Sequence, residues 1–438
     1  MKVLMFGWEF PPHISGGLGT ACYGLTRGLS KIDDLDIVFV VPKTYGDEDE
    51  SKMQLVGANS IHINQIQKHV ENFKLRHTYL EIESALIPYH DPDEYYSFRN
   101  SDLFGQNKLF KVNQEGKLDF SGKYGANLID EIYKYAYVAS TVSMENDHDV
   151  IHAHDWLCYP AGIAAKEVSG KPLVIHVHAT DFDRSGGSVN PKVYEIEKMG
   201  MDAADKIIAV SNLTRNIVIE KYGQDPAKVE TVYNAVEPVS SEEKKAIKKG
   251  VKEKVVTFLG RITMQKGPEY FIEAAYRVLK RTNDVRFVMA GSGDMLEKMV
   301  DRAAQLGIAD RFHFTGFLKG DDVFKMFALS DLYVMPSVSE PFGISPLEAM
   351  QSNVPVIISK QSGVSEILTH AIKVDYWDID ALADAIYGII KYNSLSDIFK
   401  EKGKEEVDNL KWTNAAIHTH RVYTNAIQLN KNLQKVML

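Results

Sequence analysis

The sequence predicts an α/β protein that contains two doubly wound parallel sheets. Short apolar segments alternate with helical patterns along nearly the whole chain, and several of them end in loops of glycine or polar residues. With 438 residues, the chain is also too long for one compact core. Because ligands of such sheets bind at the carboxyl ends of the strands, we expect the functional residues in these loops.

Each expected strand is a short apolar run. The first sheet is expected to contain 2–6, 37–41, a strand that ends near 154, 173–177, 207–210 and 229–232, and the second 255–259, 286–290, 312–314, 332–335 and 356–359. Between these two groups, residues 239–253 are rich in Glu, Lys and Ser, which indicates a linker with a solvated surface.

The composition excludes several classes of protein. The net charge of −9 argues against a general nucleic-acid binder, because no broad cationic face can neutralise phosphates. The two cysteines, Cys22 and Cys158, can form neither a disulfide framework nor a four-cysteine zinc site, which fits a reducing cytoplasm. No segment approaches ~18 consecutive apolar residues, so we expect a cytoplasmic protein without a transmembrane segment, and peripheral membrane contact stays open.

The most informative stretch runs from 337 to 350, directly after the expected strand 332–335. Ser345 is suited to an N-cap and Pro346 to the first position of a helix. Such a helix start offers free backbone N–H groups, and Gly343 allows an anion to approach them closely. A phosphate or diphosphate is therefore the expected ligand.

Two carboxylates, Glu340 and Glu348, lie at either end of this loop with seven residues between them. Carboxylates do not belong beside a phosphate unless they bind another group, and sugar hydroxyls are the obvious candidates. The alternative is a capping box, in which Glu348 pairs with Ser345 and only closes the helix end.

Glycine and cationic loops follow other expected strands. Gly16 and Gly17 follow the first strand, but position 22 is Cys, so the loop lacks the dinucleotide fingerprint and could also be a simple tight turn. Arg261 and Lys266 share the loop after 255–259, where two cations on their own are usually just exposed to solvent.

The chain also contains two H-x-H pairs, 152/154 and 176/178, whose members share one face of a strand. Each pair could supply two metal ligands, although histidines at strand ends are more often hydrogen-bonded core or site residues. Tyr95 and Tyr96 lie in an irregular stretch, 84–126, that mixes aromatic and short polar residues. This mixture suits sugar rings, and a small satellite core is an equal alternative.

The segments 340–343 and 346–349 read E-P-F-G and P-L-E-A, which resembles the E-x7-E signature of retaining nucleotide-sugar glycosyltransferases with the GT-B fold. Glycogen, starch and sucrose synthases belong to this superfamily. The G-R at 260–261 with K-G at 266–267 matches a further family motif, and H-D-W at 154–156 resembles that of glycogen synthases. G-G-L at 16–18 resembles K-x-G-G-L, with Ile14 or Ser15 at the lysine position.

The resemblance implies a role for each candidate residue. Gly343 and Ile344 would hold the donor diphosphate, Glu348 would bind the ribose, and Glu340 would lie beside the donor sugar. Arg261 and Lys266 would neutralise the departing diphosphate. The remaining implied donor residues are His178, with His176 as the competing assignment, Gly16, Gly17, Gly291 and Asn234. The implied acceptor-side residues are His154 and Asp155, and the composition around Tyr95 and Tyr96 adds these two to the same side.

The resemblance further implies two Rossmann-like domains that face each other across a cleft, formed by 1–238 with about 413–438 and by 254–412. The terminal helix would cross back to the first domain. The implied activity is transfer of glucose from ADP- or UDP-glucose to an α-glucan, with no metal, no other cofactor and no nucleic acid. Alternatives are another sugar or acceptor, as in sucrose or cell-surface glycan synthesis, a metal-dependent hydrolase and a non-catalytic carbohydrate-binding protein.

Overall fold

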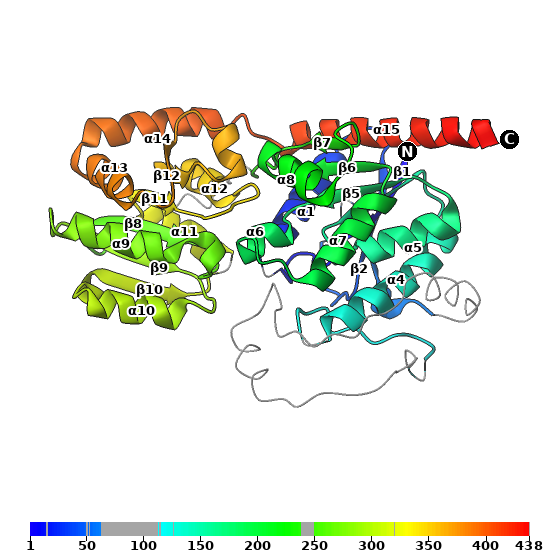
Figure 1. Cartoon of the computed structure of the whole chain (residues 1–438), viewed down its shortest axis with the longest axis horizontal. Coiled ribbons are helices and arrows are strands. Elements are labelled where there is room, and N and C mark those ends of the chain that lie inside the picture. Colours follow the sequence, from blue (N-terminus) through cyan, green and yellow to red (C-terminus); the bar gives the residue numbers. More distant parts are fainter. Residues whose placement is uncertain are drawn as a thin grey trace.

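The computed structural model describes residues 1–14, 16–49, 51, 53–62, 113, 115–125, 127–237, 249–318 and 320–437. Two α/β domains lie next to each other along the longest axis of the molecule (Figure 1). Tyr95 and Tyr96, which the sequence places on the acceptor side, lie outside the described residues.

The first domain contains a seven-stranded parallel sheet in the order β3-β2-β1-β4-β5-β6-β7. Its strands are mostly apolar, as expected for a sheet that helices cover on both faces. The strands are β1 (Lys2–Phe6), β2 (Asp36–Val41), β3 (Gln54–Gly57), β4 (Val150–His154), β5 (Leu173–Val177), β6 (Lys206–Ala209) and β7 (Val229–Thr231). The helices are α1 (Gly17–Leu29), α4 (Leu128–Glu145), α5 (Tyr159–Ser169), α6 (Asp181–Ser185), α7 (Pro191–Ala203) and α8 (Asn212–Tyr222).

The second domain contains a six-stranded parallel sheet in the order β10-β9-β8-β11-β12-β13. Its strands are β8 (Lys254–Leu259), β9 (Val285–Ala290), β10 (Phe312–Gly316), β11 (Leu332–Met335), β12 (Val356–Ser359) and β13 (Ile372–Val374). Its helices are α9 (Pro268–Leu279), α10 (Leu296–Gln305), α11 (Asp321–Leu329), α12 (Ser345–Gln351), α13 (Ile379–Lys391) and α14 (Asn393–Val407). The strand order reverses between β8 and β11, as it does between β1 and β4 in the first sheet, and each reversal opens a crevice for ligands.

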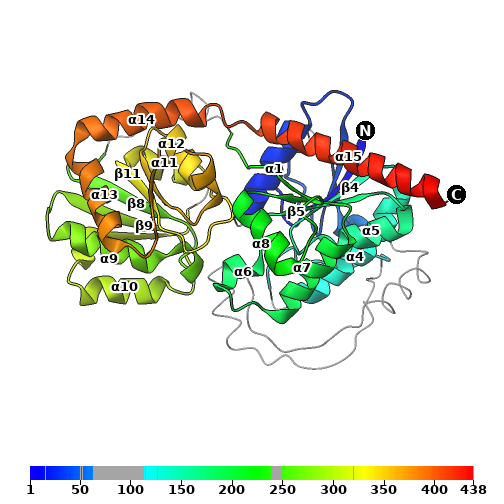
Figure 2. The same cartoon turned by 45° about the horizontal axis from the view of Figure 1, so that its top comes forward.

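The last helix, α15 (Trp412–Met437), returns to the first domain and packs against α1 and the first sheet (Figures 1 and 2). Trp412 and Tyr423 are buried in the core of the first domain. Gly24 on α1 allows this packing, because a Cβ atom there would lie 2.2 Å from the Trp412 ring. The doubly wound domains and the returning helix that the sequence predicts are thus confirmed.

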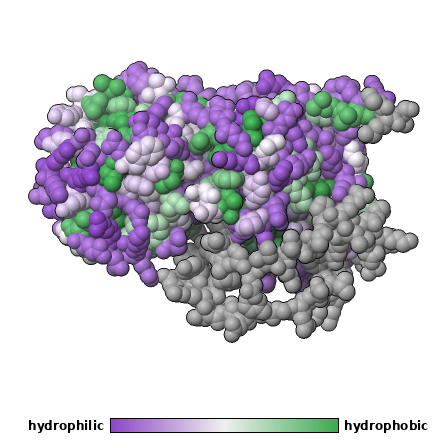
Figure 3. All heavy atoms as spheres, viewed as in Figure 1, coloured by the Kyte–Doolittle hydropathy of each residue, from purple (hydrophilic) through white to green (hydrophobic). Residues whose placement is uncertain are grey.

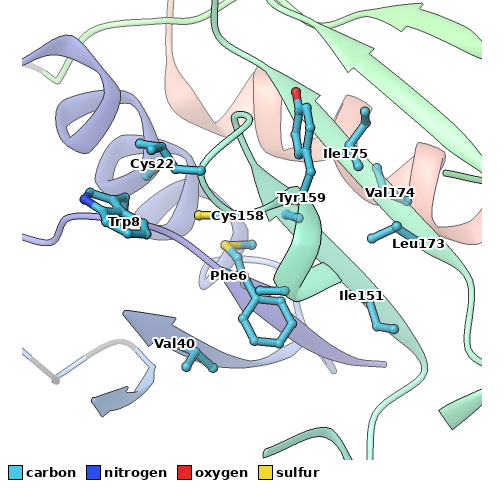
Figure 4. Close-up of a cluster of buried hydrophobic side chains, with 14 of the residues drawn as sticks. Phe6, Trp8, Cys22, Val40, Ile151, Cys158, Tyr159, Leu173, Val174 and Ile175 are labelled. Carbon is cyan, nitrogen blue, oxygen red and sulfur yellow. The ribbon is translucent and has the colours of Figure 1, made fainter. Parts of the chain in front are cut away.

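Both cysteines lie in the core of the first domain, among Phe6, Trp8 and Tyr159 (Figure 4). Burial raises the pKa of both thiols well above the usual value, so neither is a reactive thiolate at neutral pH. On the face drawn in Figure 3, hydrophobic side chains form small patches among hydrophilic ones. No described helix is both long enough and apolar enough to cross a bilayer.

The two domains are joined by hydrogen bonds as well as by apolar packing. The carboxylate of Glu366 in the second domain accepts hydrogen bonds from the N–H groups of Asn212 and Leu213, at 2.9 and 2.7 Å. These groups open helix α8, whose positive end favours a carboxylate. Ile344 from the second domain also packs against the core of the first. The domains therefore meet at the carboxyl edge of each sheet.

Candidate active site

The loops after β8 and β11 form the first part of the site. The Nζ atom of Lys266 pairs with the carboxylate of Glu340, and the Ser337 hydroxyl lies 3.4 Å from the same oxygen. Arg261 lies on the same loop as Lys266 and donates to Gln265 at 3.2 Å. The structure thus pairs Lys266 of one loop with the first carboxylate of the other, and Arg261 lies on the loop of Lys266.

Two glycines, one in the loop after β11 and one in the loop after β9, have backbone conformations that favour glycine. Gly343 has φ +98°, in the region that other residues avoid. Gly291 has φ +144°, and a Cβ atom there would lie 1.8 Å from the carbonyl oxygen of Gly260. Gly291 therefore allows the loops after β8 and β9 to lie in contact. Its predicted position beside the donor stays a prediction.

The helix start at the second carboxylate differs from the sequence prediction by one residue. Helix α12 begins at Ser345, and Ile344 is its N-cap. The Ser345 hydroxyl pairs with the Tyr333 hydroxyl at 2.8 Å instead of capping the helix, so the capping box with Glu348 does not form. Among the described residues, none accepts a hydrogen bond from the N–H groups of Gly343 or Ile344.

Glu348 is a half-buried carboxyl group, and burial raises its pKa to about 7. The energetic cost of this desolvation would be relieved by a ligand that donates hydrogen bonds to the carboxylate. A pair of neighbouring hydroxyls, such as those of a ribose, is such a donor.

The N-terminus of α1 lies in the first domain and is open to solvent. Gly16 and Gly17 are exposed, a Cβ atom on either would meet nothing within 4 Å, and no side chain caps the helix. Cys22, which follows on the same helix, has its sulfur within 4.8 Å of ring nitrogens of His154 and His178. The glycine loop and these histidines therefore belong to one region.

Four histidines cluster on β4, on β5 and directly after β5. The parallel register pairs His154 with His176, so 152, 154 and 176 share one face of the sheet. His154 Nδ1 and His178 Nε2 form a hydrogen bond of 2.9 Å. Only 1% of His176 is exposed, whereas His178 lies past the strand end and is partly exposed. The geometry therefore favours His178 over His176 as the residue that a ligand can reach.

Burial lowers the pKa of His178 to about 3, so its ring is neutral at physiological pH. A neutral imidazole bonded at Nε2 keeps Nδ1 for another partner. This makes His178 a fixed hydrogen-bonding group rather than a cation.

His154 and Asp155, which are predicted on the acceptor side, lie in the interior of the first domain. Both side chains are fully buried, so neither presents a surface to an acceptor. His154 supports His178, and Asp155 is bound 3.3 Å from the guanidinium of Arg184, which also pairs with Glu197 at 2.9 Å. Arg184 was not predicted from the sequence, because its partners Asp155 and Glu197 are distant in sequence and no local spacing indicates them.

The loop after β5 connects the two halves of the site. Thr180 and Asp183 form a capping box at the start of α6, and Asp183 accepts a hydrogen bond of 2.6 Å from Ser339 of the second domain. The same short helix contacts the turn Met264–Lys266. The His178 loop, the cationic loop and the carboxylate loop are thereby brought together.

Asn234 lies in the segment that crosses between the domains and is 8% exposed. Within the described part of the chain, no hydrogen bond joins its side chain to the other candidate residues. Its predicted donor role therefore has no direct geometric support.

The alternative of a hydrolytic metal centre can be tested on the histidines. Ligand atoms of His152, His154 and His176 lie within 4.8 Å of one another, but all three side chains are at most 1% exposed. A hydrolytic metal needs a coordination position that water and substrate can reach. This closed cluster does not provide one, and in the second group, Cys22, His154 and His178, only His178 is partly exposed.

Comparison with known proteins gives matches along most of the chain. Residues 239–406 match the family model of Glycosyl transferases group 1, and residues 130–239 match that of Glycosyltransferase Family 4. An uncharacterised glycosyltransferase of Methanocaldococcus jannaschii is 28% identical, over 98% of this chain and 99% of that protein. The glycogen synthase of Mycobacterium tuberculosis is 22% identical, over 97% and 95% of the two chains.

Among solved structures, Anabaena HepE in complex with UDP and glucose has a similar fold, with a TM-score of 0.66 and 16% identity over 97% of this chain and 100% of that one. The two sheets, the returning helix and the matching family models agree with one another. The chain therefore has the GT-B fold, and most of its length matches two families of glycosyltransferases.

Proposed function

We propose that this protein is a retaining glycosyltransferase that moves glucose from ADP- or UDP-glucose to a hydroxyl group of a growing α-glucan. The observation that carries the proposal is the meeting of the Lys266–Glu340 pair with the His178 loop, through the Ser339–Asp183 hydrogen bond. The full-length match to a glycogen synthase supports the glucan acceptor. HepE was crystallised with UDP-glucose, which supports that donor.

Each side chain would act on a defined part of the donor. Departure of the diphosphate builds negative charge, which Arg261, Lys266 and the free N–H groups near Gly343 would stabilise without a metal. The Glu348 carboxylate would accept hydrogen bonds from the ribose hydroxyls. The neutral ring of His178 would hold a hydroxyl group of the transferred sugar.

Retention of configuration requires either two inversions or attack on the face from which the diphosphate leaves. The first route needs a free carboxylate nucleophile, whereas Glu340 is engaged by Lys266 and Ser337. We therefore favour the second. The C1–O bond breaks with its electron pair going to the diphosphate, the acceptor oxygen bonds to C1 on the same face, and its proton passes to the departing diphosphate. A covalent glycosyl-enzyme found by mass spectrometry would overturn this mechanism.

The proposed function can be tested by following nucleoside diphosphate release from ADP-, UDP- and GDP-glucose, each with and without glycogen or maltooligosaccharide. Release that depends on glucan, together with an α-linked product by NMR, is the expected result. Diphosphate release that does not depend on glucan would support a transferase with another acceptor. No release from any of the three donors would exclude glucose as the transferred sugar.

A further inference from the structure

A cavity of about 630 Å³ lies between α9 and α10 on the second domain, outside the candidate active site. These helices neighbour each other on one side of the second sheet (Figure 1). Tyr270 on the first turn of α9 and Ile379 at the start of α13 contribute to its lining. The volume is within the range of sites that hold small molecules.

Aromatic side chains continue outward from the Tyr270 edge of this cavity. The rings of Tyr270 and Tyr376 lie 5.1 Å apart, and those of Tyr376 and Trp377 lie 4.8 Å apart. Trp377 is 57% exposed, whereas the other three tryptophans of the chain, Trp8, Trp156 and Trp412, are at most 5% exposed. We call Tyr270, Tyr376 and Trp377 the aromatic rim. An indole exposed to this extent, next to two tyrosines, is a surface that a ligand face could cover.

The charges of the cavity limit the chemistry of such a ligand. Five carboxylate residues and two cationic residues line it, and both cations are already paired, Lys298 with Glu269 and Arg302 with Glu273. The lining is therefore net negative and repels phosphates and other anions. Carboxylates beside aromatic rings suit a neutral ligand that offers many hydroxyl donors along with C–H faces.

The position of the rim relates it to catalysis. Tyr270 follows Lys266 by four residues, and a Cβ atom on the intervening Gly267 would lie 3.1 Å from the Tyr270 ring. Asp294 of the lining belongs to the loop after β9, next to Gly291. The cavity and the donor loops thus share the carboxyl edge of the second sheet.

From these observations we infer that the aromatic rim and the α9–α10 cavity form a second carbohydrate site, which binds an α-glucan chain at a distance from the reacting end. The inference rests on the proposed glucan acceptor. A chain held there stays at a high local concentration near the cleft, so long acceptors gain more than short ones. Short acceptors cannot occupy both sites at once.

The test uses Trp377 as its own probe. Because the other tryptophans are buried, iodide quenching of the intrinsic fluorescence reports mainly on Trp377. Saturating maltoheptaose is expected to protect this fluorescence from iodide. Trp377→Ala is expected to weaken glycogen binding in affinity electrophoresis roughly three- to tenfold, in line with one aromatic contact, and Trp377→Phe to restore part of it.

Tyr392→Ala is the matched control, since Tyr392 is 61% exposed on the same domain but neither lines the cavity nor belongs to the aromatic rim. Its glycogen binding is expected to equal that of the wild type. In activity assays, the ratio of kcat/KM for glycogen to that for maltotriose is expected to fall in Trp377→Ala and to stay constant in Tyr392→Ala.

The outcomes separate this inference from the proposed function. Glucan-dependent turnover by the wild type without protection of Trp377, or unchanged glycogen binding by Trp377→Ala, would overturn the second site alone. Protection by maltoheptaose without turnover of any donor would support the site and reject the synthase. Displacement of maltoheptaose by spermidine would mean that the acidic lining selects cations, which would also overturn the inference.

Discussion

The carboxyl group of Glu348 is expected to make donor binding depend on pH. Its pKa of about 7 means that the group is largely protonated at pH 6 in the free protein, and a protonated carboxyl loses capacity to accept ribose hydroxyls. We expect the KM for the donor to rise as the pH falls below about 7, while His178 stays neutral throughout this range.

Glu348→Gln provides the comparison for this prediction. Burial also raises the pKa of Glu197 to about 7, so a pH profile of the wild type alone would mix the two groups. The amide does not titrate, and the donor KM of the variant should be higher but nearly independent of pH from 5.5 to 8. A profile as steep as that of the wild type would assign the effect to another group.

The two cations of the β8 loop should govern turnover rather than folding. Replacing Arg261 or Lys266 with Ala is expected to lower kcat by about two orders of magnitude, if each contributes as much as one oxyanion-hole donor. Lys325→Ala removes a cation that is 58% exposed on α11 and should leave kcat unchanged. Near-normal turnover of both loop variants would remove this pair from the mechanism.

At the scale of elements, the close approach of two loops makes Gly291 intolerant of a side chain. Gly291→Ala introduces both a strained φ and a collision with the Gly260 carbonyl, and should lower the free energy of unfolding by roughly 2 kcal/mol or more. Gly250→Ala is the control, because a Cβ atom there meets nothing within 4 Å. Thermal unfolding and donor KM measured together would show whether the loop geometry affects binding as well as stability.

The elements that can be predicted from the sequence are those that depend on residues close together along the chain. The apolar runs 2–6, 173–177 and 332–335 predict their strands to the residue, because a run of mainly apolar side chains suits a parallel strand that is buried on both faces. The predicted N-cap at Ser345 is wrong by one position, because the Tyr333 hydroxyl from the neighbouring strand takes the serine side chain. A contact of that kind is invisible to a local pattern.

The same limit applies to the site. The motif loops predict which strand ends carry the candidate residues, and the resemblance adds their roles, which stay predictions. Other features of the site depend on residues that are far apart along the chain. They are the burial of His154 and Asp155, the ion pairs of Arg184 and the contact of Glu366 with α8. These features depend on how the helices and sheets pack, and the spacing of residues in the sequence does not predict that packing.

At the scale of the whole molecule, α15 completes the first domain. Removing residues after 411 would uncover the face of α1 at Gly24 and leave His152 without the hydroxyl of Tyr423, 2.6 Å away. We expect this truncated chain to bind hydrophobic dye and aggregate. A chain that ends after Asn430 should stay folded, since the side chains at 431–433 and 435 are exposed. Equal behaviour of the two truncations would contradict a core role for the helix.

The return of α15 also sets an order on synthesis. A ribosome makes the strands of the first sheet before those of the second, yet the helix that covers the first sheet emerges after both. The surface of the first domain that α15 covers therefore stays exposed while the second domain is translated and can fold as a local unit. The first domain is thus the first to be started and the last to be completed. During this interval, a chaperone would protect its exposed apolar surface from aggregation.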